Sequence, residues 1–141
     1  MNSWSCREIG ILAAAAVFSL TASAASSQDF SVGERLFLEN CSACHGNSGR
    51  GDGSVGVLFS AQPKSLRLLE NDNNGQFPFS EVYQSIKGET NIQAHGIEMP
   101  IWGSAFTKDI MSNPFISGPL GEELVQGRIL ALVYYLQSIQ D

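Results

Sequence analysis

The sequence predicts an all-α fold, and two observations carry this prediction. Apolar residues recur at helical spacing in the segments 31–40, 79–87 and 122–140. The stretches between these segments are rich in glycine, proline and asparagine, which interrupt regular structure. No internal repeat is visible in the 141 residues, and this length predicts one folded domain.

Residues 1–24 are expected to be a secretory signal peptide. Arg7 lies ahead of an almost unbroken apolar run over residues 9–20, and residues 22–24 have the A-x-A pattern of a cleavage site. The run is shorter than the roughly 20 residues of a membrane-spanning helix, so an uncleaved anchor is the weaker interpretation. We therefore expect an exported mature protein, residues 25–141, that has no membrane span.

Residues 31–40 are predicted to form a short amphipathic helix, with Val32, Leu36 and Phe37 on its apolar face. Gly33 is unusual inside this helix, because a glycine there costs about 1 kcal/mol relative to alanine. Its presence indicates that another backbone or a large ring approaches the helix closely.

Two thiols and an imidazole follow this helix in the sequence Cys41-Ser42-Ala43-Cys44-His45. The C-x-x-C-H pattern is typical of covalent haem c attachment. Each thiol would form a thioether with one haem vinyl group, and His45 would lie beneath the iron as its proximal ligand. The chain has one such motif, so we expect one haem c bound through Cys41 and Cys44.

A C-x-x-C pair also occurs in thioredoxin-like redox sites and in zinc sites. A zinc site would need two further ligands, and the chain offers only Cys6 and His95 as further cysteine and histidine. A thioredoxin-like site expects a strand before the pair, whereas a helical pattern precedes Cys41. Loss of Cys6 with the signal peptide leaves only the motif cysteines, and haem attachment would consume both.

The chain between the motif and the next predicted helix is expected to be mostly irregular. Residues 46–54 are dense in glycine and turn formers, and we expect them to wrap one side of the haem. A phosphate site is disfavoured, because no P-loop lysine with Ser or Thr follows these glycines. Residues 55–69 contain Pro63 and predict a loop that leads into a short helical turn. The helix over 79–87 should then end at Gly88.

Residues 91–103 have no clean periodicity and are predicted to be a loop. This segment nevertheless contains His95, Met99 and Trp102, and loops that carry such side chains on a rigid scaffold are often functional. Pro100 biases the backbone of Met99 toward an extended conformation.

Residues 107–121 contain Asn-Pro and Gly-Pro pairs and are predicted to be a surface loop. Residues 122–140 form the clearest helix of the chain, and the acidic residues of its first turn suit the helix dipole. The predicted buried stripe of this helix consists of Leu124, Val125, Ile129, Leu132, Val133, Leu136 and Ile139.

The mature chain keeps seven basic and thirteen acidic residues, so its net charge stays at −6. Repulsion from phosphates argues against a nucleic-acid partner. Long-range attraction favours a partner with a basic docking face, or one that docks through apolar contacts around the haem edge. The alternative is that the acidity only keeps the protein soluble.

Together these features resemble the class I cytochromes c, a family of small monohaem electron-transfer proteins, over residues 33–140. Gly33 and Phe37 lie where the family has the glycine and the aromatic residue of its first helix. Residues 132–136 are similar to its terminal helix, which crosses the first helix at that glycine. Pro63 resembles the proline whose carbonyl accepts a hydrogen bond from the proximal imidazole. The resemblance implies a cytochrome c-like fold, with three to five short helices around one covalent haem c.

Residues 99–103, Met-Pro-Ile-Trp-Gly, resemble the distal-ligand loop of many bacterial members. The resemblance implies that His45 and Met99 are the axial ligands. His95 is the main competitor, since it lies four residues before Met99 and its ligation would lower the redox potential. Met111 is a more remote candidate. The structural alternative for Met99 is ordinary core packing.

What the resemblance implies about function is one-electron transfer rather than enzymatic catalysis, because protein side chains fill both axial positions. We expect a periplasmic carrier that exchanges electrons with a donor and an acceptor protein. The first alternative is a permanent electron-accepting subunit of a periplasmic dehydrogenase or oxidase complex, with residues 107–121 in the interface. The second is a haem enzyme or gas sensor with a displaceable distal ligand.

Overall fold

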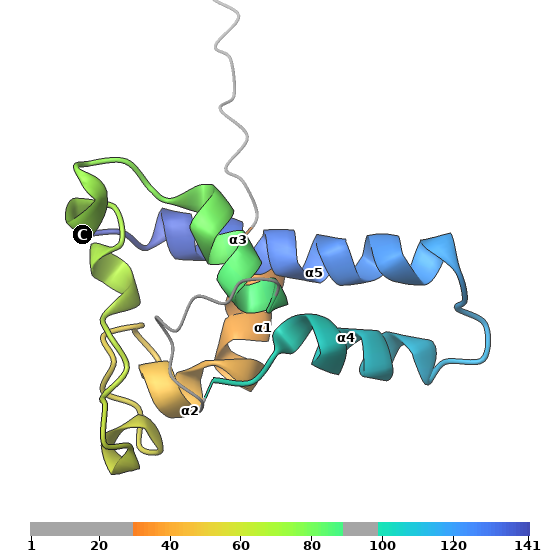
Figure 1. Ribbon diagram of the computed structural model, residues 1–141, viewed down its shortest axis with the longest axis horizontal. Helices are drawn as coiled ribbons and strands as arrows, with labels where there is room; N and C mark the ends of the chain where they lie inside the picture. The colour runs from red at the N-terminus through yellow and green to blue at the C-terminus, as the bar shows by residue number, and fades with distance from the viewer. Residues whose placement is uncertain (1–29, 89–98) are drawn as a thin grey trace, which may run out of the picture.

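The computed structural model describes residues 30–88 and 99–141. This part of the chain is helical and contains no strand, which confirms the predicted all-α fold (Figure 1). Its α-helices are α1 (Ser31–Asn40), α2 (Ser42–His45), α3 (Phe79–Lys87), α4 (Trp102–Met111) and α5 (Pro119–Ser138). Its short 3₁₀ turns are η1 (Gly56–Leu58), η2 (Leu66–Leu68) and η3 (Asn71–Asn73).

The 20-residue helix α5 is the element against which α1, α3 and α4 pack. α4 runs antiparallel to the first half of α5, while α1 and α3 lie against its second half (Figure 1). The buried apolar side chains therefore form one cluster along α5. Its members are Leu36, Phe37, Leu66, Val82, Ile86, Phe106, Ile110, Val125, Ile129, Leu132, Val133, Tyr135 and Leu136.

Helix α1 has the predicted bounds, and Gly33 is the point at which it crosses α5. A Cβ at position 33 would collide with the carbonyl oxygen of Ala131 and would lie 2.7 Å from the Cβ of Tyr135. The Phe37 and Tyr135 rings, whose centroids are 5.4 Å apart, continue the contact. The close approach expected at Gly33 is confirmed, and the approaching group is the α5 backbone.

The prediction of a loop over residues 107–121 was wrong, because α4 runs through to Met111 and only residues 112–118 connect it to α5. Gly103, Phe106 and Ile110 are buried at helical spacing on the face of α4 that meets α5. The Asn-Pro and Gly-Pro pairs interrupt helical structure only in the connection between α4 and α5.

Helix α5 begins at Pro119, three residues before the predicted start at Glu122, and ends at Ser138. Proline is favoured at the first helical position, where its missing N–H has no intrahelical partner to lose. The Gly-Pro pair thus starts the helix here. Two residues assigned to buried faces are instead largely exposed, Val32 (49%) and Leu124 (41%), because each lies just outside the narrow stripe along which its helix meets its neighbours.

The irregular segment around η2 is held by the last two residues of the chain. The Gln140 side chain donates to the carbonyl of Leu66 (2.8 Å) and accepts from the N–H of Glu70 (3.0 Å). The Asp141 carboxylate accepts from Nε of Arg67 at 2.8 Å, and its own N–H donates to the Arg67 carbonyl at 3.0 Å. A segment with little secondary structure is thereby fixed to the end of α5.

Candidate cofactor site

The two cysteines and the histidine of the motif share one side of the single-turn helix α2. The N–H groups of Cys44 (3.2 Å) and His45 (2.9 Å) both donate to the carbonyl of Cys41. Residues three and four positions apart lie on the same face of a helix. Accordingly, Cys41, Cys44 and His45 all line one cavity, and the intervening residues of the turn do not.

This cavity has a volume of about 280 Å³ and adjoins a second cavity of about 250 Å³. Four residues line both, namely Cys41, His45, Leu66 and Met99. Each cavity alone is close to the lower limit of the roughly 300–1,000 Å³ typical of ligand sites, and the two together lie within that range. The sequence-predicted residues Cys41, Cys44, His45 and Met99 are therefore brought together around one space.

The first cavity is lined by the haem motif, by the segment between η1 and η2, and by the start of α4. The residues from the η1–η2 segment are Phe59, Ala61, Gln62, Pro63, Lys64 and Leu66. The motif side adds Asn40, and the α4 side adds Pro100 and Trp102. Pro63 thus lies in the wall that also contains His45, as the resemblance implied; its role as a hydrogen-bond acceptor stays a prediction.

The second cavity extends from the motif toward α3 and α5. Its wall includes Phe37 from α1 and Leu132 and Leu136 from α5, so the core formed around the α1–α5 crossing becomes the floor of the site. The remaining wall residues are Leu69, Glu81, Val82, Ser85 and Ile86. Sequence reasoning placed Val82 and Ile86 on the apolar face of α3. The sequence analysis did not identify Glu81 and Ser85 as wall residues, because the helical pattern does not distinguish a polar residue that faces a cavity from one that faces solvent.

The glycine-rich segment after the motif packs against the backbone of α2. The N–H of Gly51 donates to the carbonyl of His45 (2.8 Å), and the N–H of Val55 donates to that of Ala43 (2.9 Å). A Cβ on Gly53 would lie 2.5 Å from the carbonyl carbon of Cys44, and one on Gly56 would collide with the Cys44 carbonyl oxygen. The glycines are thus needed for backbone to pack on backbone, and this packing supports an α2 that is only one turn long.

Burial determines the ionisation of the first motif cysteine. Desolvation, with a smaller contribution from Cys44, raises the pKa of the Cys41 thiol from 9.0 to about 12. Burial therefore disfavours the thiolate that disulfide exchange requires, which argues against a redox dithiol. Over the described residues, no group of three or more His, Cys, Asp or Glu side chains is placed to hold a metal ion, so no zinc ligand set accompanies the two cysteines there. His45 is the buried polar side chain at the centre of the site, with 9% of its surface exposed.

Of the three candidates for a second iron ligand, the structure places two. Met99 is partly buried, lines both cavities, and precedes Pro100 and the first turn of α4. Met111 lies at the far end of α4, lines neither cavity, and packs on Gly121, where a Cβ would be 2.9 Å from its sulfur. His95 lies outside the described residues. Position therefore favours Met99 over Met111.

Comparison with known proteins identifies the family. Residues 30–140 match the family model described as Cytochrome c. The chain belongs to the cytochrome c family. No curated protein and no solved structure matched the chain. Membership implies covalently bound haem c and haem-based electron transfer, and it confirms that the chain is a c-type cytochrome, as the sequence suggested.

The residues of the site fit the cofactor that cytochrome c membership implies. Cys41 and Cys44 provide two sulfurs on one wall, an imidazole lies beside them, and a thioether lies in the walls of both cavities. Leu66, Leu132 and Leu136 provide an apolar surface such as a porphyrin ring requires. Over the described parts of the chain, no helix has both the length and the apolar character needed to cross a bilayer.

Proposed function

We propose that this cytochrome c is a periplasmic one-electron carrier with a single haem c. In this proposal Cys41 and Cys44 would form the two thioethers, and His45 and Met99 would bind the iron. The observation that carries the proposal is that Cys41, His45 and Met99 line both cavities and that Cys44 lines the first one. The haem, when bound, supplies one-electron exchange between Fe(III) and Fe(II).

The protein residues bind, orient and shield the cofactor. The one-turn helix α2 and the glycines packed against it keep both cysteines and His45 on one wall. Partly buried Phe59 and Trp102 and buried Leu66 line the walls and exclude water. A methionine at the distal position would block substrates from the iron and favour electron transfer over catalysis.

A test of haem attachment uses acid–acetone extraction of the purified mature protein. We expect haem to stay with the wild-type chain, because thioethers resist acid extraction, and to be released from the double variant Cys41→Ala/Cys44→Ala. A matched control is Cys6→Ala, which alters the cysteine expected to be removed with the signal peptide. Acid-resistant haem in the double variant would contradict the proposal.

The proposed location rests on the sequence of residues 1–24, and its test is independent of haem. We expect N-terminal sequencing of protein isolated from a periplasmic extract to begin near Ala25. Replacing Leu12 and Leu20 in the apolar run with arginine should keep the precursor uncleaved, because a charged segment no longer resembles a signal peptide. A mature protein that retains Met1 would contradict cleavage near Ala25, and recovery of the haem protein from the cytoplasmic fraction alone would exclude this location.

A second candidate function is that of a permanent subunit in a larger redox complex. The observation that favours it is Phe115, which is 91% exposed between α4 and α5. A free carrier needs only a weak, short-lived interface. Gel filtration of the native protein from its own periplasm distinguishes the two, since the carrier elutes at its monomer size and the subunit elutes with a larger protein.

A further inference from the structure

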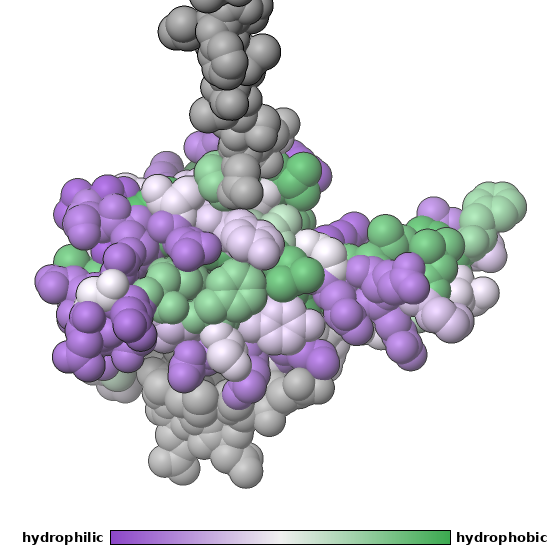
Figure 2. Space-filling view, turned by 90° about the horizontal axis from the view of Figure 1, so that it is seen from above, coloured by the Kyte–Doolittle hydropathy of each residue, from purple (hydrophilic) through white to green (hydrophobic). Residues whose placement is uncertain are grey.

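The turn between α4 and α5 forms an exposed apolar tip at the end of a projecting helical hairpin. We define the hairpin tip as residues 111–121, and this stretch contains no charged residue. Within it Phe115 is 91%, Leu120 51% and Met111 38% exposed. The hairpin extends well past the body of the molecule, and hydrophobic side chains gather at its end (Figure 2). Contiguous exposed apolar surface of this kind marks an interaction site.

The hairpin tip is internally ordered, so Phe115 is presented on a fixed backbone. The side-chain oxygen of Asn113 accepts from the N–H of Phe115 (3.0 Å), and its carbonyl accepts from the N–H of Ile116 (3.1 Å). The partly exposed side chain of Met111 packs on Gly121, so the two ends of the hairpin tip are in contact. Because this backbone is held before binding, an interface would have to order only the side-chain torsions of Phe115, and aromatic residues are frequent binding hot spots.

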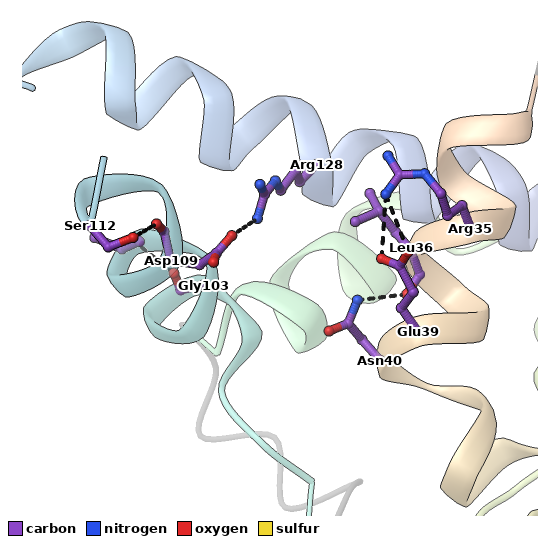
Figure 3. A network of polar contacts seen from close by, with 9 residues as sticks. Arg35, Leu36, Glu39, Asn40, Gly103, Asp109, Ser112 and Arg128 are labelled. Carbon is purple, nitrogen blue, oxygen red and sulfur yellow. Dashed lines mark hydrogen bonds and ion pairs between the residues drawn. The ribbon is translucent and has the colours of Figure 1, made fainter. Parts of the chain in front are cut away.

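The two helices of the hairpin are also tied together below the tip. Arg128 of α5 donates to the Asp109 carboxylate of α4 at 2.6 Å (Figure 3). The same guanidinium lies 5.5 Å from the Phe106 ring centroid. Ser112 donates to the Asp109 carbonyl at 2.6 Å, which fixes the end of α4 (Figure 3). The tip therefore moves with the hairpin as one unit.

From this surface we propose that the hairpin tip docks into an apolar pocket of a partner protein, and that basic residues surround that pocket. The charges around the hairpin tip are the reason for expecting a partner with a basic rim. Glu122 and Glu123 are exposed directly beside the tip on α5, Lys108 is the nearby exposed cation on α4, and the whole chain carries −6. An acidic rim around an apolar centre is complementary to a basic rim around an apolar pocket.

The same charges disfavour the other two occupants. An anionic lipid surface would repel Glu122 and Glu123 together with the rest of the acidic chain. In a symmetric dimer the same patch meets itself, so the two glutamate pairs would face each other. Docking through the tip involves no residue of the cofactor site, so this proposal goes beyond electron transfer and stands or falls independently of it.

The test begins with the photoreactive residue p-benzoylphenylalanine in place of Phe115 in the full chain, expressed in its native host. The protein cross-linked to it is identified by mass spectrometry, purified, and measured by surface plasmon resonance against the holoprotein. We expect Phe115→Ser to weaken this binding about tenfold or more, as truncation of a central interface aromatic does. The matched control is Leu58→Ser, which removes a side chain that is 79% exposed. Leu58 ends η1, and this element lies at the opposite end of the molecule from the hairpin tip (Figure 1).

Charge is tested with a second matched pair. Glu123→Lys should weaken binding several-fold at low ionic strength and much less at high ionic strength, because salt screens exposed charges. Asp72→Lys makes the same change in net charge on η3, away from the tip, and should have a smaller effect. The visible spectrum of Phe115→Ser should match that of the wild type, so a failed docking proposal leaves the haem proposal untouched.

Several outcomes overturn the docking proposal. These are cross-linking to a second copy of this chain, cross-linking to lipid, the absence of any cross-linked product, and a partner whose affinity changes less than about twofold in Phe115→Ser. Flotation of the holoprotein with phosphatidylcholine vesicles that depends on Phe115 would assign the tip to a membrane surface. Sedimentation that shows a Phe115-dependent dimer would assign it to self-association.

Discussion

Gly33 and Tyr135 meet where α1 crosses α5, and the Cβ of Tyr135 would be 2.7 Å from any Cβ placed on residue 33. This contact sets the position of α1, whose last turn leads directly into Cys41. It also brings Phe37 together with Leu132 and Leu136 in the wall of the second cavity. The crossing is therefore both a packing contact and the element that aligns the cysteine motif with the floor of the site.

Gly33→Ala should destabilise the protein by about 1–3 kcal/mol, the range typical of overpacked positions, because the added methyl meets backbone atoms that cannot rotate away. Gly127→Ala is the matched control, since residue 127 also lies in a helix and a Cβ there meets nothing within 4 Å. That change should be neutral or stabilise by up to about 1 kcal/mol. Urea unfolding of both variants measures the difference, and equal free energies of unfolding would contradict the crossing.

Gly53→Ala should reduce the fraction of purified protein that carries covalent haem. The added Cβ would lie 2.5 Å from the carbonyl carbon of Cys44 and would displace α2, which is held by few hydrogen bonds of its own. We expect an overpacking loss of about 1–3 kcal/mol and a lower ratio of haem to protein absorbance. Gly127→Ala again serves as the control. A normal haem ratio in Gly53→Ala would show that this close packing is not required for attachment.

Of the helices, the one before the motif and the next long one after it were predicted most accurately from the sequence. Helices α1 and α3 have the bounds expected from their apolar spacing, and Gly33 indicated the crossing before its partner was visible. The local apolar pattern was sufficient to predict the bounds of these helices, because each buries one regularly spaced stripe of residues. The cysteine motif was equally clear, since its spacing by itself places three side chains on one face.

The α4–α5 hairpin was mispredicted because local signals at its turn outweighed the pattern around them. Asn113-Pro114 and Gly118-Pro119 are strong interruptions, yet Phe106 and Ile110 continue a helical stripe before them and Pro119 begins the next helix. Several residues of the cavity walls could not be predicted from local patterns. Phe59, Leu66 and Ser85 reach the site through the tertiary fold, and Leu66 is held there by Gln140, 74 residues away in the chain.

The ion pair between Arg67 and Asp141 should make stability depend on pH in the acid range. The hydrogen bond from Arg67 lowers the pKa of the Asp141 carboxyl from 3.8, so the folded state favours the charged form. A lowered folded-state pKa contributes stability that is present above the unfolded pKa and is lost as pH falls through the folded value. Asp141→Asn should therefore lower the melting temperature at neutral pH, and the difference from wild type should shrink below about pH 4.

The matched control for this pH dependence is Glu39→Gln, which removes an exposed pair with Arg35 within α1 (Figure 3). Pairs of this kind contribute little, so its melting temperature should stay close to wild type at every pH. Thermal unfolding followed by circular dichroism across the acid range measures both variants. A constant difference between Asp141→Asn and wild type at all pH values would show that the carboxylate charge is not the cause.

Met99→Ala should abolish the long-wavelength methionine-to-ferric-iron absorption band and lower the redox potential, because Met99 lines both cavities and methionine ligation raises the potential of haem iron. Met111→Ala removes the same kind of side chain outside the cavities and should leave the band and the potential unchanged. His95→Ala distinguishes the remaining competitor. If the wild type lacks the band, and His95→Ala rather than Met99→Ala alters the spectrum, the distal ligand is His95. In that case the role of Met99 is to pack against the cofactor. Visible absorption and a spectroelectrochemical titration of the three purified holoproteins decide between the two ligands in one series.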